Sequence, residues 1–108
     1  MQCVRVDPGG PLSKVRLSQR DAHAHLGGSL TMVGAIDDLH VFVVALREPP
    51  AQAALNTACR DERYFDVPVH GPVLFVATNQ EGEEIDVDYD ALLERLDVRM
   101  LEHSGIEG

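Results

Sequence analysis

The chain has 108 residues, 44% of them hydrophobic, which is the common size for a single domain and enough apolar material for one core. Nine Lys and Arg residues stand against eighteen Asp and Glu residues, and the formal charge of -9 argues against direct binding of nucleic acid or an anionic membrane and favours basic partners. No segment approaches the length of a membrane span and no basic leader opens the chain, so the sequence predicts a cytoplasmic protein.

The first elements are expected to be a β-hairpin and a short helix. Hydrophobic and polar residues alternate over residues 3–6 and again over residues 14–17, and a cluster of turn formers lies between the two segments. Ser18 and Asp21 resemble a capping box, which predicts a helix that begins there and ends at Leu26. The two glycines that follow are expected to stop this helix in a left-handed cap.

Three strands are expected in the centre of the chain. Alternation over residues 29–36 favours a strand, and two aspartates supply the turn into the next one. Residues 41–46 and 73–77 are apolar at every position. Such runs are typical of central strands that are covered on both faces, so helices must cover at least one face of the sheet.

Two more helices are predicted in the second half. A proline pair at residues 49–50 begins an alanine-rich segment of high helix propensity that is expected to be helical to about Cys59 or Arg60. Asp86 or Asp88 is expected to cap the last helix, whose apolar stripe consists of Leu92, Leu93 and Leu96 and continues to Met100.

These elements predict a single α+β domain over residues 1–101, with a small mixed or antiparallel β-sheet of about five strands and two to three helices packed on it. Residues 102–108 are expected to form a frayed C-terminal tail. The two cysteines, Cys3 and Cys59, lie far apart in the sequence and lack the repeated spacing of a disulfide framework. They are interpreted as reduced thiols in an intracellular compartment.

Several short signatures follow one another along the chain in the order of a known family. They are Leu26-Gly27-Gly28-Ser29-Leu30, the apolar strand from His40 to Leu46, Leu55-Asn56-Thr57-Ala58, Gly71-Pro72-Val73-Leu74-Phe75-Val76, and Glu81-Gly82. In this order and over most of its length, the chain resembles a family of small uncharacterised proteins from viruses, phages and mobile elements, the domain of unknown function DUF3846.

Two segments depart from the family pattern. Ala77-Thr78 stands where a glycine is usual, and the sequence Arg-Glu-Pro-Pro at residues 47–50 replaces a Glu-Gly turn. The resemblance implies a viral or mobile-element accessory protein that works inside a host cell. It transfers no catalytic residue, because the family has no established active site.

Histidines and cysteines raise the questions of a zinc site and of a nucleophile. The nominal zinc ligands are His23, His25, Cys59, His70 and Cys3. Their spacing contains no paired motif, which favours surface histidines beside a buried thiol. The nucleophile–base pairs Cys59 with His70 and Ser104 with His103 have no third group to orient them. We therefore predict no catalytic, cofactor-binding or metal-ligating residue, and no enzyme, although a small metal-binding protein or metalloenzyme using Cys and His is an alternative.

An acidic segment is the most unusual feature of the sequence. Its six carboxylates lie within ten residues and are Glu81, Glu83, Glu84, Asp86, Asp88 and Asp90. A solvated turn with a helix cap is the favoured interpretation. A calcium loop is a weaker one, because the EF-hand spacing is absent. A surface that imitates the phosphate row of DNA is the third, and the segment is our candidate acidic interaction surface.

The sequence favours a non-enzymatic viral or mobile-element accessory protein that acts as an intracellular protein-interaction domain. Its expected partner is a host or viral protein of basic character, and no cofactor is expected. The alternative is an acidic DNA mimic that inhibits a host nucleic-acid-binding protein. A homodimer is also open, because four basic residues among the first twenty predict a basic pole that could face the acidic C-terminal end of a second copy.

Overall fold

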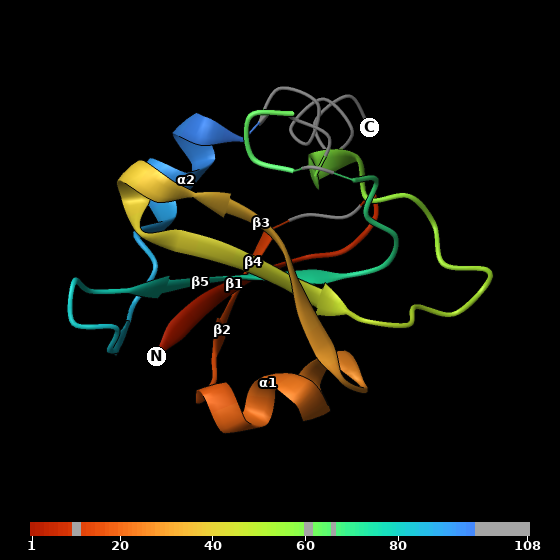
Figure 1. Cartoon of the computed structure of the whole chain (residues 1–108), viewed down its shortest axis with the longest axis horizontal. Coiled ribbons are helices and arrows are strands. Elements are labelled where there is room, and N and C mark those ends of the chain that lie inside the picture. Colours follow the sequence, from red (N-terminus) through yellow and green to blue (C-terminus); the bar gives the residue numbers. More distant parts are fainter. Residues whose placement is uncertain (10–11, 60–61, 66, 97–108) are drawn as a thin grey trace.

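The computed structural model describes residues 1–9, 12–59, 62–65 and 67–96 of the chain. It contains a six-stranded antiparallel sheet in the order β2-β1-β5-β4-β3, with β6 also paired to β5 (Figure 1). The strands are β1 (Gln2–Val6), β2 (Leu12–Arg16), β3 (Leu30–Ile36), β4 (Val41–Leu46), β5 (Val73–Thr78) and β6 (Glu84–Ile85). The helices are α1 (Gln19–Leu26), α2 (Tyr89–Arg95) and the short 3-10 turns η1 (Asp37–Leu39) and η2 (Thr57–Cys59). The predicted α+β class is confirmed.

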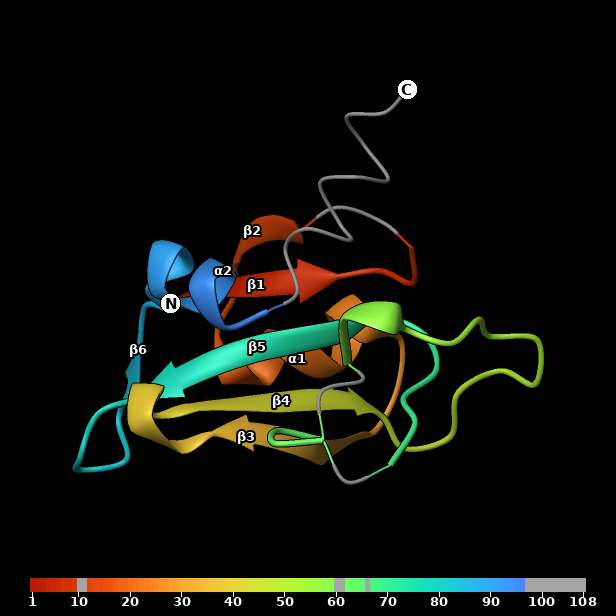
Figure 2. The same cartoon turned by 90° about the horizontal axis from the view of Figure 1, so that it is seen from above.

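The two sides of the sheet are covered unequally. Figure 1 shows α1 and α2 on opposite sides, and Figure 2 shows β3, β4, β5 and β1 in succession across the sheet. The larger core lies on the α2 side and consists of Val4, Val6, Ile36, Val41, Val43, Ala45, Cys59, Phe65, Val69, Val73, Phe75, Ala77, Val87, Leu92 and Leu96. The smaller core lies on the α1 side and has only five buried residues, Cys3, Ala22, Leu26, Leu74 and Val76. The α1 side is therefore the less completely covered side.

The N-terminal hairpin and α1 form where the sequence predicts them. The N–H groups of Gly27 and Gly28 both donate to the carbonyl oxygen of His23, at 2.8 and 3.0 Å, and Gly27 has a φ of 96°, so the left-handed cap is confirmed. The prediction of a capping box at the start of this helix is wrong. Ser18 donates its hydroxyl to the carboxylate of Asp21 at 2.9 Å, and the Asp21 N–H donates to the backbone oxygen of Ser18 instead of the side chain.

Both uniformly apolar segments are interior strands, but only one of them is covered on both faces. In β5, residues 73–77 are buried without exception. In β4, buried side chains on the α2 side alternate with half-buried side chains on the α1 side, where Phe42, Val44 and Leu46 lie. The expectation of two covered faces is thus right for β5 and wrong for β4. The reason is that α1 has only eight residues and covers only part of its side of the sheet.

The outer edge of β3 is irregular and partly occupied. The pairing with β4 shifts register between Met32 and Gly34, which marks a bulge. Beyond the bulge, Gly34 forms an isolated bridge with Phe65, and the Ala35 N–H donates to the carbonyl oxygen of Tyr64 at 3.0 Å. The chain itself therefore closes the second half of this edge.

The helix predicted over residues 49–59 is not formed. The Asn56 N–H donates to the Val69 oxygen at 2.7 Å and the Gly71 N–H donates to the Ala54 oxygen at 2.9 Å, so this backbone pairs with residues 69–71 instead of with itself. The side-chain amide of buried Asn56 also donates to the carbonyl oxygens of Val6 and Gly71, each at 3.0 Å. Tertiary hydrogen bonds override the helix propensity of the alanines here, and only the 3-10 turn η2 remains.

The last helix is confirmed with Asp88 as its N-cap. The Asp88 carboxylate accepts a hydrogen bond from the Ala91 N–H at 3.2 Å, and Leu92 is fully buried. Arg95 donates to the Asp38 carboxylate at 2.8 Å, which ties α2 to the connection between β3 and β4. Met100 and the predicted tail lie outside the described residues, as does the end of the predicted domain at residue 101. In the described part, neither helix has the length and apolar character needed to cross a membrane.

Candidate functional site

The acidic segment begins in the turn between β5 and β6, which one asparagine organises. The side-chain oxygen of Asn79 accepts from the N–H groups of Glu81 and Glu83, at 3.0 and 2.9 Å. Gly82 between them has a φ of 82°, a left-handed conformation that suits glycine. All residues from 81 to 86 are exposed, so the turn presents its carboxylates to solvent.

Three of the six carboxylates in the segment have roles inside the fold. Asp86 accepts from the Gln2 N–H at 2.6 Å, Asp88 caps α2, and Glu83 accepts from the side-chain amide of Asn79 at 3.3 Å. Among the described residues, no hydrogen-bond donor reaches the carboxylates of the other three, Glu81, Glu84 and Asp90. The interpretation as a turn with a helix cap thus accounts for half of the segment.

The basic hairpin and the acidic segment are neighbours and not opposite poles. The Val87 N–H donates to the Gln2 oxygen at 2.9 Å, and Gln2 pairs with Arg16 across the hairpin. The Lys14 ammonium lies 4.6 Å from the centre of the Tyr89 ring, where it makes a cation–π contact. The predicted separation of charge along the molecule is therefore wrong, and it no longer supports a head-to-tail homodimer.

An open groove of about 350 Å³ lies on the α1 side of the sheet. We call it the α1-side groove. Its lining residues come from α1 and from strands β3, β4, β5 and β6 together with the first residue and the acidic turn: Met1, Ala22, His23, Leu30, Thr31, Met32, Phe42, Val44, Val76, Ala77, Thr78, Gly82 and Glu84. Most of these side chains are apolar, and the volume falls in the range of known binding sites.

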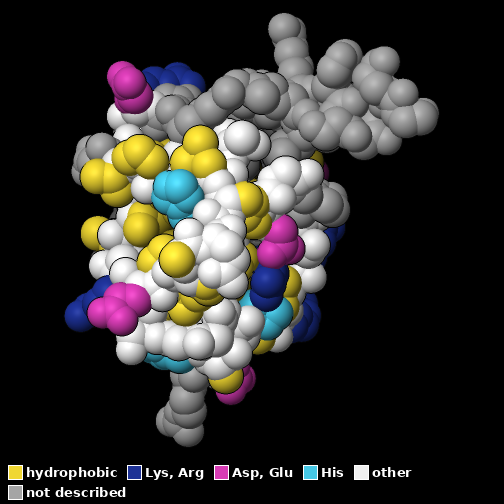
Figure 3. Space-filling model, turned by 90° about the vertical axis from the view of Figure 1, so that its right-hand side faces the viewer, with side chains coloured by type: hydrophobic (Ala, Val, Ile, Leu, Met, Phe, Trp, Pro, Cys, Tyr) yellow, Lys and Arg dark blue, Asp and Glu magenta, His cyan; other side chains and the backbone are white. Residues whose placement is uncertain are grey.

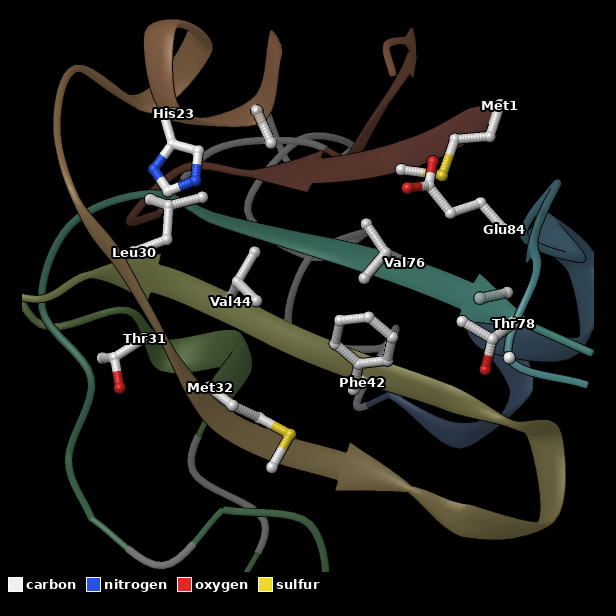
Figure 4. Close-up of a pocket in the computed structure, with 13 residues that line it drawn as sticks. Met1, His23, Leu30, Thr31, Met32, Phe42, Val44, Val76, Thr78 and Glu84 are labelled. Carbon is white, nitrogen blue, oxygen red and sulfur yellow. The ribbon is translucent and has the colours of Figure 1, made fainter. Parts of the chain in front are cut away.

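Figure 4 shows how the groove is built. Phe42 and Val44 of β4 and Val76 of β5 form its floor, and Met32 stands at the β3 side. His23 of α1 lies over one end, and Glu84 of the acidic segment lies at the other. The groove therefore has an apolar centre and polar ends.

Met32 is the most exposed of the large hydrophobic side chains on the described residues, with 66% of its surface open to solvent. Its cross-strand partner Val44 is only half-buried. The sequence places Met32 correctly on a strand but predicts nothing unusual about it. The feature that could have indicated its exposure is the length of α1, because a two-turn helix is too short to cover the whole face of the sheet beneath it.

The nominal zinc ligands and nucleophiles are dispersed. Cys3 and Cys59 are free thiols buried on opposite sides of the sheet, and burial raises the pKa of the Cys59 thiol to about 12. His70 is exposed and its Nδ1 lies 3.2 Å from the Ala53 oxygen. His23 lines the groove, whereas the Nε2 atom of His25 is buried and has no hydrogen-bond partner among the described residues.

No cluster of three or more His, Cys, Asp or Glu side chains in the described part of the chain is arranged to hold a metal ion. Ser104 and His103 lie outside the described residues.

A second apolar surface lies at the end of the molecule formed by the connection between β4 and β5. Leu55 and Val67 in this connection are 48% and 56% exposed. Figure 3 looks onto this end and shows hydrophobic side chains spread among polar and backbone atoms. Unlike the α1-side groove, this surface is not bordered by the acidic turn.

Comparison with known proteins identifies no relative: no family model, no curated protein and no solved structure matches the chain. The resemblance to the DUF3846 family stays a prediction.

Proposed function

We propose that this protein is a non-enzymatic interaction domain that binds a basic protein partner through the α1-side groove. The observation that carries the proposal is the half-covered face of β4, an interior strand whose apolar side chains on the α1 side are only half-buried. The origin in a virus or mobile element, and action inside a host cell, rest on the family resemblance alone.

Exposed apolar surface on an interior strand has an energetic cost that a partner can remove. Met32 pairs with Val44 across β3 and β4, and Phe42 lies two residues from Val44 on the same face of β4, so the three side chains line one groove. Complete burial of a side chain of this size contributes about 1.5–3 kcal/mol. Contiguous apolar patches with polar rims mark interaction sites on other proteins.

Charge supports a basic partner. The acidic turn borders the groove through Gly82 and Glu84, and the whole chain carries a formal charge of -9. Opposite charges raise the rate of encounter and orient the partner before contact. A DNA mimic has weaker support, because Glu83, Asp86 and Asp88 already accept hydrogen bonds within the fold.

Site-specific photo-crosslinking tests this function. A benzophenone amino acid is placed at Met32 in the groove and, as the matched control, at Glu94 on α2 at the other side of the sheet. After irradiation in cells that make the protein, we expect a discrete protein adduct from position 32 and none from position 94. Equal adducts from both positions, or none from position 32, would show that the groove is not the binding surface.

A further inference from the structure

We propose that the occupant of the α1-side groove is a single amphipathic α-helix of the partner, lying along β4 beside α1. Its apolar face contacts the floor of the groove, and Lys or Arg side chains at one end meet Glu84. This inference rests on the proposed function and adds the form and orientation of the partner.

The width and spacing of the floor match a helix. From β3 to β5 the floor spans two strand separations, about 10 Å in total, which is close to the diameter of a helix with its side chains, about 10–12 Å. Along β4, Phe42 and Val44 are two residues apart, which corresponds to about 7 Å. Four residues of a helix rise by about 6 Å, so apolar residues at positions i and i+4 would meet both side chains.

The helix α1 shows how this side of the sheet accepts a helix. Its inward residues Ala22 and Leu26 are four positions apart and pack with Leu74, Val76 and Cys3. This contact fully buries residues of β1 and β5, whereas the α1-side residues of β4 stay half-buried and Met32 of β3 stays exposed. A second helix beside α1 would complete the layer.

An extended peptide added to the edge of β3 fits the structure less well. The bulge after Met32 interrupts the strand, and the Ala35 N–H beyond it is already bonded to Tyr64. Only the first three residues of β3, Leu30 to Met32, precede this interruption. The exposed apolar surface also lies on the face of the strand and not along its edge, which favours a helix in a groove over strand addition.

The carboxylates at one end of the groove give the helix a direction. Glu84 lines one end, and the turn beside it carries Glu81, Glu83 and Asp86 as well, all exposed. The amino group of Met1 lies at this end too and donates to the Leu17 oxygen at 3.0 Å, but the four carboxylates outnumber it. A helix N-terminus or basic side chains are favoured at this end, because both place positive charge near carboxylates.

A display selection with the whole protein as bait tests the occupant. One phage library presents 18-residue helices with Leu, Ile or Met fixed on one face and all other positions randomised. A parallel library presents extended peptides of the same length. Selected peptides are synthesised, and their Kd values are measured at low and high salt against the wild-type protein and its variants.

Three variants separate the parts of the proposal. Met32→Lys places a charge at the β3 side of the groove, at a position that is exposed to solvent. Glu84→Gln removes one carboxylate at the groove, and Glu94→Gln removes one from an exposed position of α2 on the other side of the sheet. We expect helical binders rich in Lys or Arg toward one end, a loss of affinity of about tenfold or more with Met32→Lys and about threefold with Glu84→Gln at low salt, and no change with Glu94→Gln.

Other outcomes overturn the inference. These are binders from the extended library alone, helical binders that keep their affinity for Met32→Lys, and equal losses with Glu84→Gln and Glu94→Gln. A crosslink from position 32 without any helical binder would leave the proposed function standing and refute the helix. Helical binders without that crosslink would refute the proposed function, and with it the partner helix, and would show only that the groove can accept a helix in vitro.

Discussion

Replacement of Gly34 by alanine is expected to loosen the contact between β3 and residues 64–65. A Cβ atom at this position would stand 2.5 Å from the Tyr64 backbone oxygen and 2.6 Å from the Phe65 Cδ1 atom. Ordinary contacts begin at 3.4 Å, so the Tyr64 oxygen must retreat by about 0.9 Å, and a backbone atom cannot do so without moving its segment.

The size of the effect follows from three contributions. Overpacking costs about 1–3 kcal/mol. The hydrogen bond from the Ala35 N–H to the Tyr64 oxygen, now 3.0 Å long, contributes about 1 kcal/mol that the displacement would remove. The lower conformational entropy of alanine in the unfolded chain offsets this loss of stability by about 0.4–1 kcal/mol. We therefore expect Gly34→Ala to lower the free energy of unfolding by about 2 kcal/mol.

Urea denaturation followed by circular dichroism measures this difference, and amide hydrogen exchange at Ala35 reports the local opening. Gly28→Ala is the matched control, because a Cβ atom there would lie 3.3 Å from the Leu46 Cδ2 atom, the movable end of a flexible side chain. We expect the control to change stability by less than about 1 kcal/mol. A Gly34→Ala protein as stable as the wild type, with the Ala35 amide still protected, would refute the close approach of the two segments.

Two further predictions concern buried polar groups. Asn56→Ala removes the side-chain amide that donates to the Val6 and Gly71 carbonyl oxygens, each at 3.0 Å. We expect this variant to lower the free energy of unfolding, measured by urea titration, by about 2–4 kcal/mol. A decrease below about 1 kcal/mol would contradict the structural role of this amide. For Cys59, burial raises the pKa from 9.0 to about 12, so the thiolate forms more readily in the unfolded chain. The stability that this group contributes is fully present below pH 9, and up to about 4 kcal/mol of it is lost as the pH rises toward 12. Cys59→Ala should therefore make the free energy of unfolding fall less steeply with pH above pH 9. Identical pH dependence in the two proteins would contradict this prediction.

The sequence predicts well those elements whose signals are local. The glycine pair after Leu26 ends α1 through hydrogen bonds that lie within one turn, and Asp88 caps α2 through a neighbour three residues away. Both are decided by residues close in the chain, so a pattern of residue types is enough to find them.

The errors have a common physical cause, which is dependence on distant contacts. The alanines before Cys59 favour a helix, yet Asn56 and its neighbours bond to residues 69–71 and to β1. The apolar runs of β4 and β5 look alike in the sequence, and only the short reach of α1 leaves one of them partly open. The α1-side groove results from this difference in coverage between β4 and β5, so no local sequence motif predicts it. Of its residues, only Glu84 was among the candidate interaction residues, as one carboxylate of the acidic segment.

The place of β5 in the sheet has a consequence for the order in which the chain can fold. The pairs β1–β2 and β3–β4 are each local hairpins, but β1 and β4 meet only through β5, which begins at Val73. During synthesis, both hairpins emerge well before the strand that joins them. Loop closure over such separations is slow, and unpaired inner edges of half-made sheets attract other chains. The nascent protein therefore exposes the inner edges of β1 and β4 until most of its residues have been made.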